Sequence, residues 1–149
     1  MRQTFTFGLE RVRELREHTE AQAKEDLAAS LHQRMRGAAM LAAASDALAA
    51  AAQAGRPAAG ARLSAEDLIA HERWVQSLKQ QEETAALSLD RLDAEVDARR
   101  VALGEASRER EVLERLKERQ REAHSLDAAR REGAELDELA LNRHVRRAA

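Results

Sequence analysis

Apolar and small side chains recur at alternating spacings of three and four residues along most of the chain, the pattern of a helix that packs through one face. No proline interrupts this pattern at its start, so it predicts a first long helix over about residues 5–53. Two rows with a seven-residue period predict a coiled-coil seam, the face through which the helix packs on its partner. These rows are Leu27, Arg34, Leu41 and Leu48, and Leu31, Ala38, Ser45 and Ala52. An earlier set lies out of phase with them and predicts a stutter near residues 23–27, namely Leu9, Val12, Thr19 and Ala23.

The single proline and two glycines fall within residues 54–64, which predicts a turn after the first helix. Ser64 and Asp67 have the spacing of an N-terminal helix cap, in which the serine oxygen accepts a backbone N–H bond and the carboxylate reaches back. A second, longer helix is therefore predicted over about residues 65–145. Its seam rows are Leu68, Val75, Glu82, Leu89, Val96 and Leu103, and His71, Leu78, Ala85, Leu92, Arg99 and Ala106.

Two long helices joined by a turn predict an all-α fold, a two-helix antiparallel coiled-coil hairpin forming one unit over residues 1–149. A turn centred near Ala59 pairs residues whose numbers sum to roughly 119. The expected pairs are Leu48 with His71, Leu41 with Leu78, Leu31 with Leu89, and Leu27 with Leu92. In this register the second helix overhangs the first beyond about Leu116. The uncovered apolar residues there predict a surface for another protein, and they are Leu126, Leu136 and Leu139.

Composition narrows the classes of partner. The chain is 35% charged and 2% aromatic, and its formal net charge of −2 comes from interleaved acidic and basic residues. Nucleic-acid binders usually present a basic field, so no nucleic-acid partner is expected. The absence of cysteine fits a reducing compartment. The start does not resemble a signal peptide and no apolar run is long enough to span a bilayer, so a cytoplasmic location is expected.

The titratable residues offer little for chemistry. No two of the five histidines stand four residues apart on a helix face, so no metal site is expected. Carboxylates on the convex, wet surface of two helices lack the burial that tunes a pKa for acid–base catalysis. We therefore expect no catalytic residue, no cofactor and no enzyme activity. The arginines near the end suit either the negative end of a helix or contact with nucleic acid, and they are Arg143, Arg146 and Arg147.

Trp74 is the single tryptophan, and Leu78 follows one helical turn later on nearly the same face. Leu78 belongs to a predicted seam row, whereas Trp74 lies beside the seam. Trp74 therefore either packs at the seam edge or serves as an anchor for a partner, since exposed tryptophan is typical of interface hot spots.

Four segments, in this order and spacing, resemble the FliJ family, the soluble stalk proteins of the bacterial flagellar type III export apparatus. The segments are Phe5–Val12, Trp74–Leu78, Glu111–Gln120, and Leu136–Ala140 with Arg143. The resemblance covers nearly the whole chain. The family commonly has tyrosine or phenylalanine at the position of Trp74, and the alanine-rich stretch 38–61 does not align.

The resemblance implies a hairpin similar to the central stalk subunit of rotary ATPases. The end with both termini would insert into the hexameric export ATPase, promote ring assembly and help couple ATP hydrolysis to export, which serves flagellum assembly, motility and chemotaxis. The apolar residues at this end are Phe5, Phe7, Leu9, Val12, Leu113 and Leu116. Trp74 and Leu78 match positions that imply contact with the export gate protein. The later part of the second helix would bind export chaperones, with the protein peripheral to the membrane-bound apparatus.

Two other functions share these features of the sequence. The equivalent stalk of a virulence-type secretion system would have the same helices and the same overhang. A generic coiled-coil scaffold that associates with itself through its seam would also fit the pattern.

Overall fold

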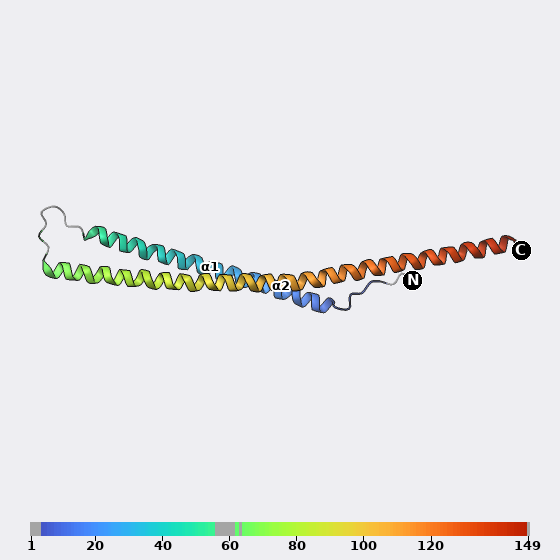
Figure 1. The fold of residues 1–149 in the computed structure, drawn as a ribbon, viewed down its shortest axis with the longest axis horizontal. Coiled ribbons are helices and arrows are strands. Elements are labelled where there is room, and N and C mark those ends of the chain that lie inside the picture. Colours follow the sequence, from blue (N-terminus) through green and yellow to red (C-terminus); the bar gives the residue numbers. More distant parts are fainter. Residues whose placement is uncertain (1–3, 56–61, 63, 149) are drawn as a thin grey trace. The chain divides into compact units, whose positions relative to one another are not determined.

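The computed structural model describes residues 4–55, 62 and 64–148, and it contains two α-helices, α1 (Glu10–Ala54) and α2 (Ala65–Ala148). Within these ranges there is no strand. The helices pack against each other in opposite directions, and α2 with 84 residues is much longer than α1 with 45 (Figure 1). The predicted all-α, two-helix antiparallel hairpin with an overhanging second helix is confirmed.

The start of each helix follows from its local sequence. α1 begins at Glu10, later than the expected start near residue 5, because Gly8 and Leu9 form a turn in which the Glu10 N–H donates to the Phe7 carbonyl at 3.1 Å. At the start of α2 the Asp67 N–H donates to Ser64 Oγ at 3.1 Å, and the Ser64 N–H donates to Asp67 Oδ2 at 3.3 Å. This reciprocal pair confirms the predicted cap of α2.

The seam of α1 keeps one predicted row and shifts the other by one residue. The residues of its two rows that are buried or half-buried are Arg13, Arg16, Glu20, Ala23, Leu27, Ser30, Gly37, Leu41, Ala44, Leu48 and Ala51. The row through Leu27, Leu41 and Leu48 is the predicted one. The second row runs through Gly37 and Ala44 instead of Ala38 and Ser45. The three-and-four spacing continues from residue 13 to residue 51, so the stutter expected near residues 23–27 is wrong.

The seam of α2 follows both predicted rows over most of their length. Its buried and half-buried members include Val75, Leu78, Glu82, Ala85, Leu89, Leu92, Val96, Leu103 and Ala106. Leu68 begins one predicted row but is 52% exposed. The first turns of α2 therefore extend beyond the stretch that α1 covers.

The pairing of the two helices differs from the predicted register by one heptad. Gly37 lies against Leu89 and Leu92, the Ser45 hydroxyl contacts the Glu82 carboxylate, and paired residue numbers sum to roughly 126 instead of 119. A displacement of seven residues keeps the same rows in the seam, so the apolar pattern is nearly as well satisfied in both registers. Pairing of polar residues distinguishes them, because a polar side chain in the seam is stabilised by a polar partner.

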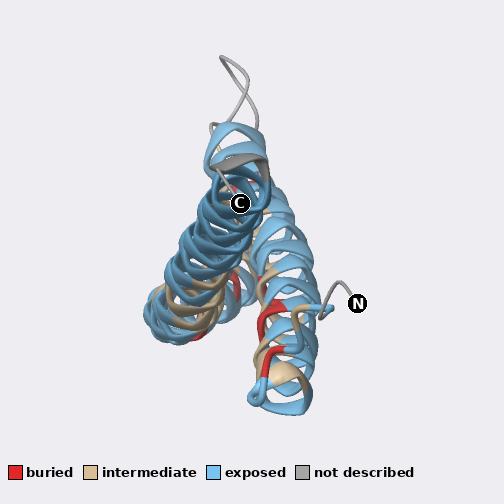
Figure 2. Cartoon of the chain, turned by 90° about the vertical axis from the view of Figure 1, so that its right-hand side faces the viewer, coloured by how far each residue is buried: buried red, intermediate tan, exposed pale blue. Residues whose placement is uncertain are grey.

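The contacts divide the chain into two compact units, each described by itself. The hairpin unit comprises Ala21–Gly104, and its most buried side chains are Ser30, Ala51, Leu78 and Val96. The terminal unit comprises Met1–Glu20 with Glu105–Ala149, and its most buried side chains are Phe7, Glu20 and Ala106. Figure 2 shows how few positions on either helix are buried. The expectation of one coiled-coil unit over the whole chain stays a prediction.

Candidate partner-binding surfaces

The N-terminal aromatic residues are packed inside the terminal unit. Phe7 is 5% exposed, and the half-buried Phe5 ring lies tilted against the His124 ring with centroids 5.7 Å apart. Contacts between α2 and the N-terminal segment thus extend along α2 as far as His124. The prediction that α2 loses its intramolecular partner after about Leu116 is wrong by two helical turns, because the segment before α1 continues along the helix.

Four further predicted site residues flank this packing. Leu9 and Val12 are 41% and 40% exposed, whereas Leu113 and Leu116 are half-buried. Leu9 and Val12 are accessible to a partner, while the two α2 leucines also contribute to the packing of the terminal unit. A role for these four residues in binding a partner stays a prediction.

A network of ion pairs holds the same part of the terminal unit together. Glu10 contacts Arg13 at 2.7 Å and Lys117 at 2.8 Å, and Arg13 also contacts Glu114 at 3.0 Å. Hydrogen bonds from Arg13 and then Lys117 hold the pKa of the Glu10 carboxyl below its ordinary value. Bonds to Glu10 and then Glu114 raise the pKa of the Arg13 guanidinium, which stays charged. The network fixes α1 against α2 without a large apolar core.

Glu20 forms a buried polar cluster that the sequence reading missed. The residue is 6% exposed, and its carboxylate accepts bonds from Ser107 Oγ at 2.9 Å and Arg110 Nε at 2.5 Å. Extending the row of Leu27 and Leu41 back by seven residues reaches Glu20, so the heptad pattern contains the signal. A buried carboxylate with two partners across the interface restricts how the helices pair.

Trp74 and Leu78 differ in accessibility. Leu78 is 9% exposed in the seam, whereas Trp74 is 50% exposed and makes an edge-on contact with the His71 ring at 5.8 Å between centroids. The contact fits packing at the seam edge, and the open half of the indole fits an anchor for a partner. Both interpretations of Trp74 therefore stay predictions.

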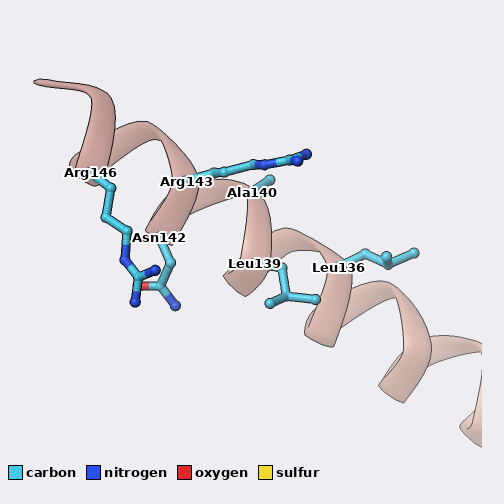
Figure 3. Close-up of a pocket in the computed structure, with 6 residues that line it drawn as sticks. All are labelled: Leu136, Leu139, Ala140, Asn142, Arg143 and Arg146. Carbon is cyan, nitrogen blue, oxygen red and sulfur yellow. The ribbon is translucent and has the colours of Figure 1, made fainter.

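The end of α2 carries exposed apolar side chains on more than one face of the helix. The predicted residues Leu126, Leu136 and Leu139 are 60%, 66% and 64% exposed. Leu141 and Val145, which the sequence reading did not select, are 66% and 65% exposed. A shallow surface near this end is lined by Leu136, Leu139, Ala140, Asn142, Arg143 and Arg146 (Figure 3). All six belong to one helix, so this surface is an open face of α2 and not an enclosed cleft.

The described residues offer surfaces for contact with other molecules. Residues 4–55, 62 and 64–148 contain no group of three or more histidine or acidic side chains placed to hold a metal ion. In the same part of the chain no helix is long and apolar enough to cross a membrane. Each buried side-chain nitrogen or oxygen that the structure describes has a hydrogen-bond partner. The exposed apolar side chains described above are candidates for binding other proteins.

Comparison with known proteins identifies the family. No curated protein and no solved structure matches the chain. A family model described as flagellar FliJ protein matches residues 5–149, which is nearly the whole chain and includes both helices and the exposed end of α2. The chain therefore belongs to the flagellar FliJ protein family.

Proposed function

We propose that this protein is a cytoplasmic stalk and coupling subunit of flagellar export that binds the hexameric export ATPase and regulates it. Membership of the family gives the chain a role in flagellar protein export. The finer proposal rests on the end of α2. Large apolar side chains there are about two-thirds exposed, and they follow His124, whose ring contacts Phe5. Such a face is stabilised by a partner that covers it.

The neighbouring charges indicate the kind of partner surface. Arg143 and Arg146 line the same face as Leu136 and Leu139 (Figure 3). An apolar groove with acidic groups at its rim would complement this combination. We expect the central opening of a hexameric ring to present such a groove between its subunits. Leu9 and Val12 are further exposed apolar residues that a partner would contact.

Two weaker contacts complete the proposal. The exposed half of Trp74 would contact the export gate protein, with Leu78 holding the underlying seam. The exposed face through Leu126 would recruit export chaperones, so that chaperones and the ATPase compete for the end of α2. With these contacts the protein would lie at the periphery of the membrane-bound export apparatus.

The proposal is tested with the purified chain and the export ATPase of the same organism. Leu136→Asp combined with Leu139→Asp should weaken ring binding by at least about tenfold and remove stimulation of ATP hydrolysis, because charge replaces two exposed apolar anchors. Binding is measured by titration, hydrolysis by phosphate release, and helicity by circular dichroism.

Leu87→Asp is the matched control, because Leu87 is 62% exposed on α2 but lies in the hairpin unit. The control should stimulate the ATPase like the unmodified chain. Full stimulation by the Leu136 and Leu139 variant, with unchanged helicity, would show that the end of α2 does not bind the ring.

The family match supports the flagellar system over a virulence-type secretion system. Self-association as a scaffold is the remaining alternative, and it predicts a stable oligomer of the free chain.

A further inference from the structure

The hairpin unit has a second register available one heptad away from the observed one. In both registers the same rows of α1 and α2 face each other, because coiled-coil rows repeat every seven residues. The observed register places Leu41 opposite Ala85 and Ala51 opposite Val75, as the contact of Gly37 with Leu89 requires. A shift of seven residues would place Leu41 opposite Leu78.

Polar pairs favour the observed register. Arg34 Nε contacts Asp93 Oδ1 at 2.5 Å, and the Ser45 hydroxyl contacts the Glu82 carboxylate. After a shift of one heptad, Arg34 would lie beside Ala86 and Ser45 beside Val75. The Ser45–Glu82 contact is part-buried and the Arg34–Asp93 pair is exposed, so each favours the observed register by a modest amount.

Apolar residues favour the shifted register. Leu68 belongs to a seam row of α2, yet it is 52% exposed because α1 ends at Ala54. After the shift, Ala51 would lie opposite Leu68 and cover it. The shift would also bring Leu27 opposite Leu92, whereas in the observed register Leu27 lies opposite Arg99, which pairs with Asp26 at 3.3 Å.

We propose that the hairpin unit is a two-register seam. The Arg34–Asp93 and Ser45–Glu82 contacts hold the observed register, and a slide of α1 by one heptad along α2 exchanges them for apolar pairing at Leu68 and Leu92. The slide moves α1 by about 10 Å along its axis. The ten residues between Ala54 and Ala65 reach about 33 Å when extended, so the connection permits the movement.

The slide would give the protein an axial motion of its own. A register change would move the α1 residues of the hairpin unit past their α2 partners and would separate Asp26 from Arg99. A partner that binds one register more tightly would shift the equilibrium between the two. This change of register does not depend on which partner binds the end of α2.

Disulfide trapping tests the proposal in the full-length chain, which has no cysteine of its own. All test pairs contain Val75→Cys on α2. Ala51→Cys reports the observed register, and Ala44→Cys reports the shifted register one heptad earlier on α1. In the observed register Ala44 lies seven residues, or about 10 Å, from the level of Val75 along the axis, too far for a disulfide. Ala49→Cys is the control, because Ala49 is exposed on the opposite face of α1 at an intermediate level.

We expect the Ala51 pair to form a disulfide fastest and the Ala44 pair to form one at least about tenfold faster than the Ala49 pair. Adding Arg34→Ala and Ser45→Ala should raise the rate of the Ala44 pair several-fold, whereas the exposed substitutions Arg36→Ala and Ser88→Ala should not. Helicity measured before oxidation verifies that each variant is folded.

Equal rates for the Ala44 and Ala49 pairs, both with and without the Arg34 and Ser45 substitutions, would overturn the two-register seam. A variant that loses helicity is replaced by the single substitution Ser45→Ala, for which the same comparison applies.

Discussion

Single polar side chains decide much of the pairing in this protein. Glu20, Arg34 and Glu82 lie in or beside the seam rows where a coiled coil usually has leucine, isoleucine or valine, and each has a partner on the other helix. The seam buries few large apolar side chains, with Phe7, Leu78 and Val96 the largest of the buried hydrophobic residues that the structure describes. Specific polar contacts therefore have a larger share in choosing the structure than in a leucine-rich coiled coil.

Replacing Glu20 by glutamine tests the buried cluster. Glu20→Gln removes the charge that faces Arg110 and weakens the bond from Ser107, so we expect a loss of about 1–3 kcal/mol in the free energy of unfolding. Urea denaturation followed by circular dichroism measures the loss. Glu118→Gln at an exposed position is the control, and equal effects of the two substitutions would contradict a special role for Glu20.

The ion pairs of Glu10 predict a dependence of stability on pH. Because its pKa is lower in the folded state than the ordinary 4.5, the contribution of Glu10 is complete above that value and is lost as the pH falls through the folded-state pKa. Glu10→Gln should therefore reduce the difference in melting temperature between pH 6 and pH 3 relative to the unmodified chain. Thermal melts across this range provide the measurement, and an identical pH dependence of the two proteins would refute it.

At the scale of the helices, the sequence predicts the elements and the faces but not their alignment. Both rows of α2 and one row of α1 follow from heptad spacing, and the Ser64–Asp67 cap follows from local chemistry. The register does not follow, because rows that repeat every seven residues give similar apolar pairing at each heptad step. The late start of α1 was missed because the apolar spacing continues through Gly8 and Leu9, whereas these two residues form a turn in which the Glu10 N–H donates to the Phe7 carbonyl.

Two glycines inside helices predict local effects of different size for an added methyl group. A Cβ at Gly133 would meet no atom within 4 Å, whereas a Cβ at Gly37 would lie 2.6 Å from Leu92 Cδ1. Gly133→Ala should stabilise the end of α2 by about 0.5–1 kcal/mol through helix propensity, and Gly37→Ala should gain less because Leu92 must move. Amide hydrogen exchange measures the local effect at each site. A larger gain at Gly37 would contradict the close packing there.

At the scale of the whole chain, the family and the general role agree with the sequence pattern, while the binding residues stay predictions. The exposed end of α2 was predicted because apolar residues continue beyond the reach of the shorter helix. The residue at which this exposed end begins was not predicted, because the segment before α1 contacts α2 as far as His124. Trp74 shows why sequence alone leaves two roles open. One side of the indole ring contacts His71 at the seam edge, and the exposed part remains free to contact a partner.

The assembly state of the free chain separates a stalk from a scaffold. The interleaved charges and the intramolecular seam favour a monomer at micromolar concentration, with the exposed apolar side chains at the end of α2 left for another protein. Light scattering coupled to size-exclusion chromatography measures the mass. A stable dimer or higher oligomer at these concentrations would favour the scaffold and argue against the stalk.

The exposed end of α2 also bears on the lifetime of the protein. A helical segment with few tertiary contacts opens locally at a low free-energy cost, and proteases cleave such open segments. Arg130 and Arg143 lie on this exposed stretch and offer cleavage sites after basic residues. Copies without a partner would then be trimmed first, while a partner covering Leu136 and Leu139 would shield the same bonds. Assembly and turnover would in this way be linked by one uncovered stretch of helix.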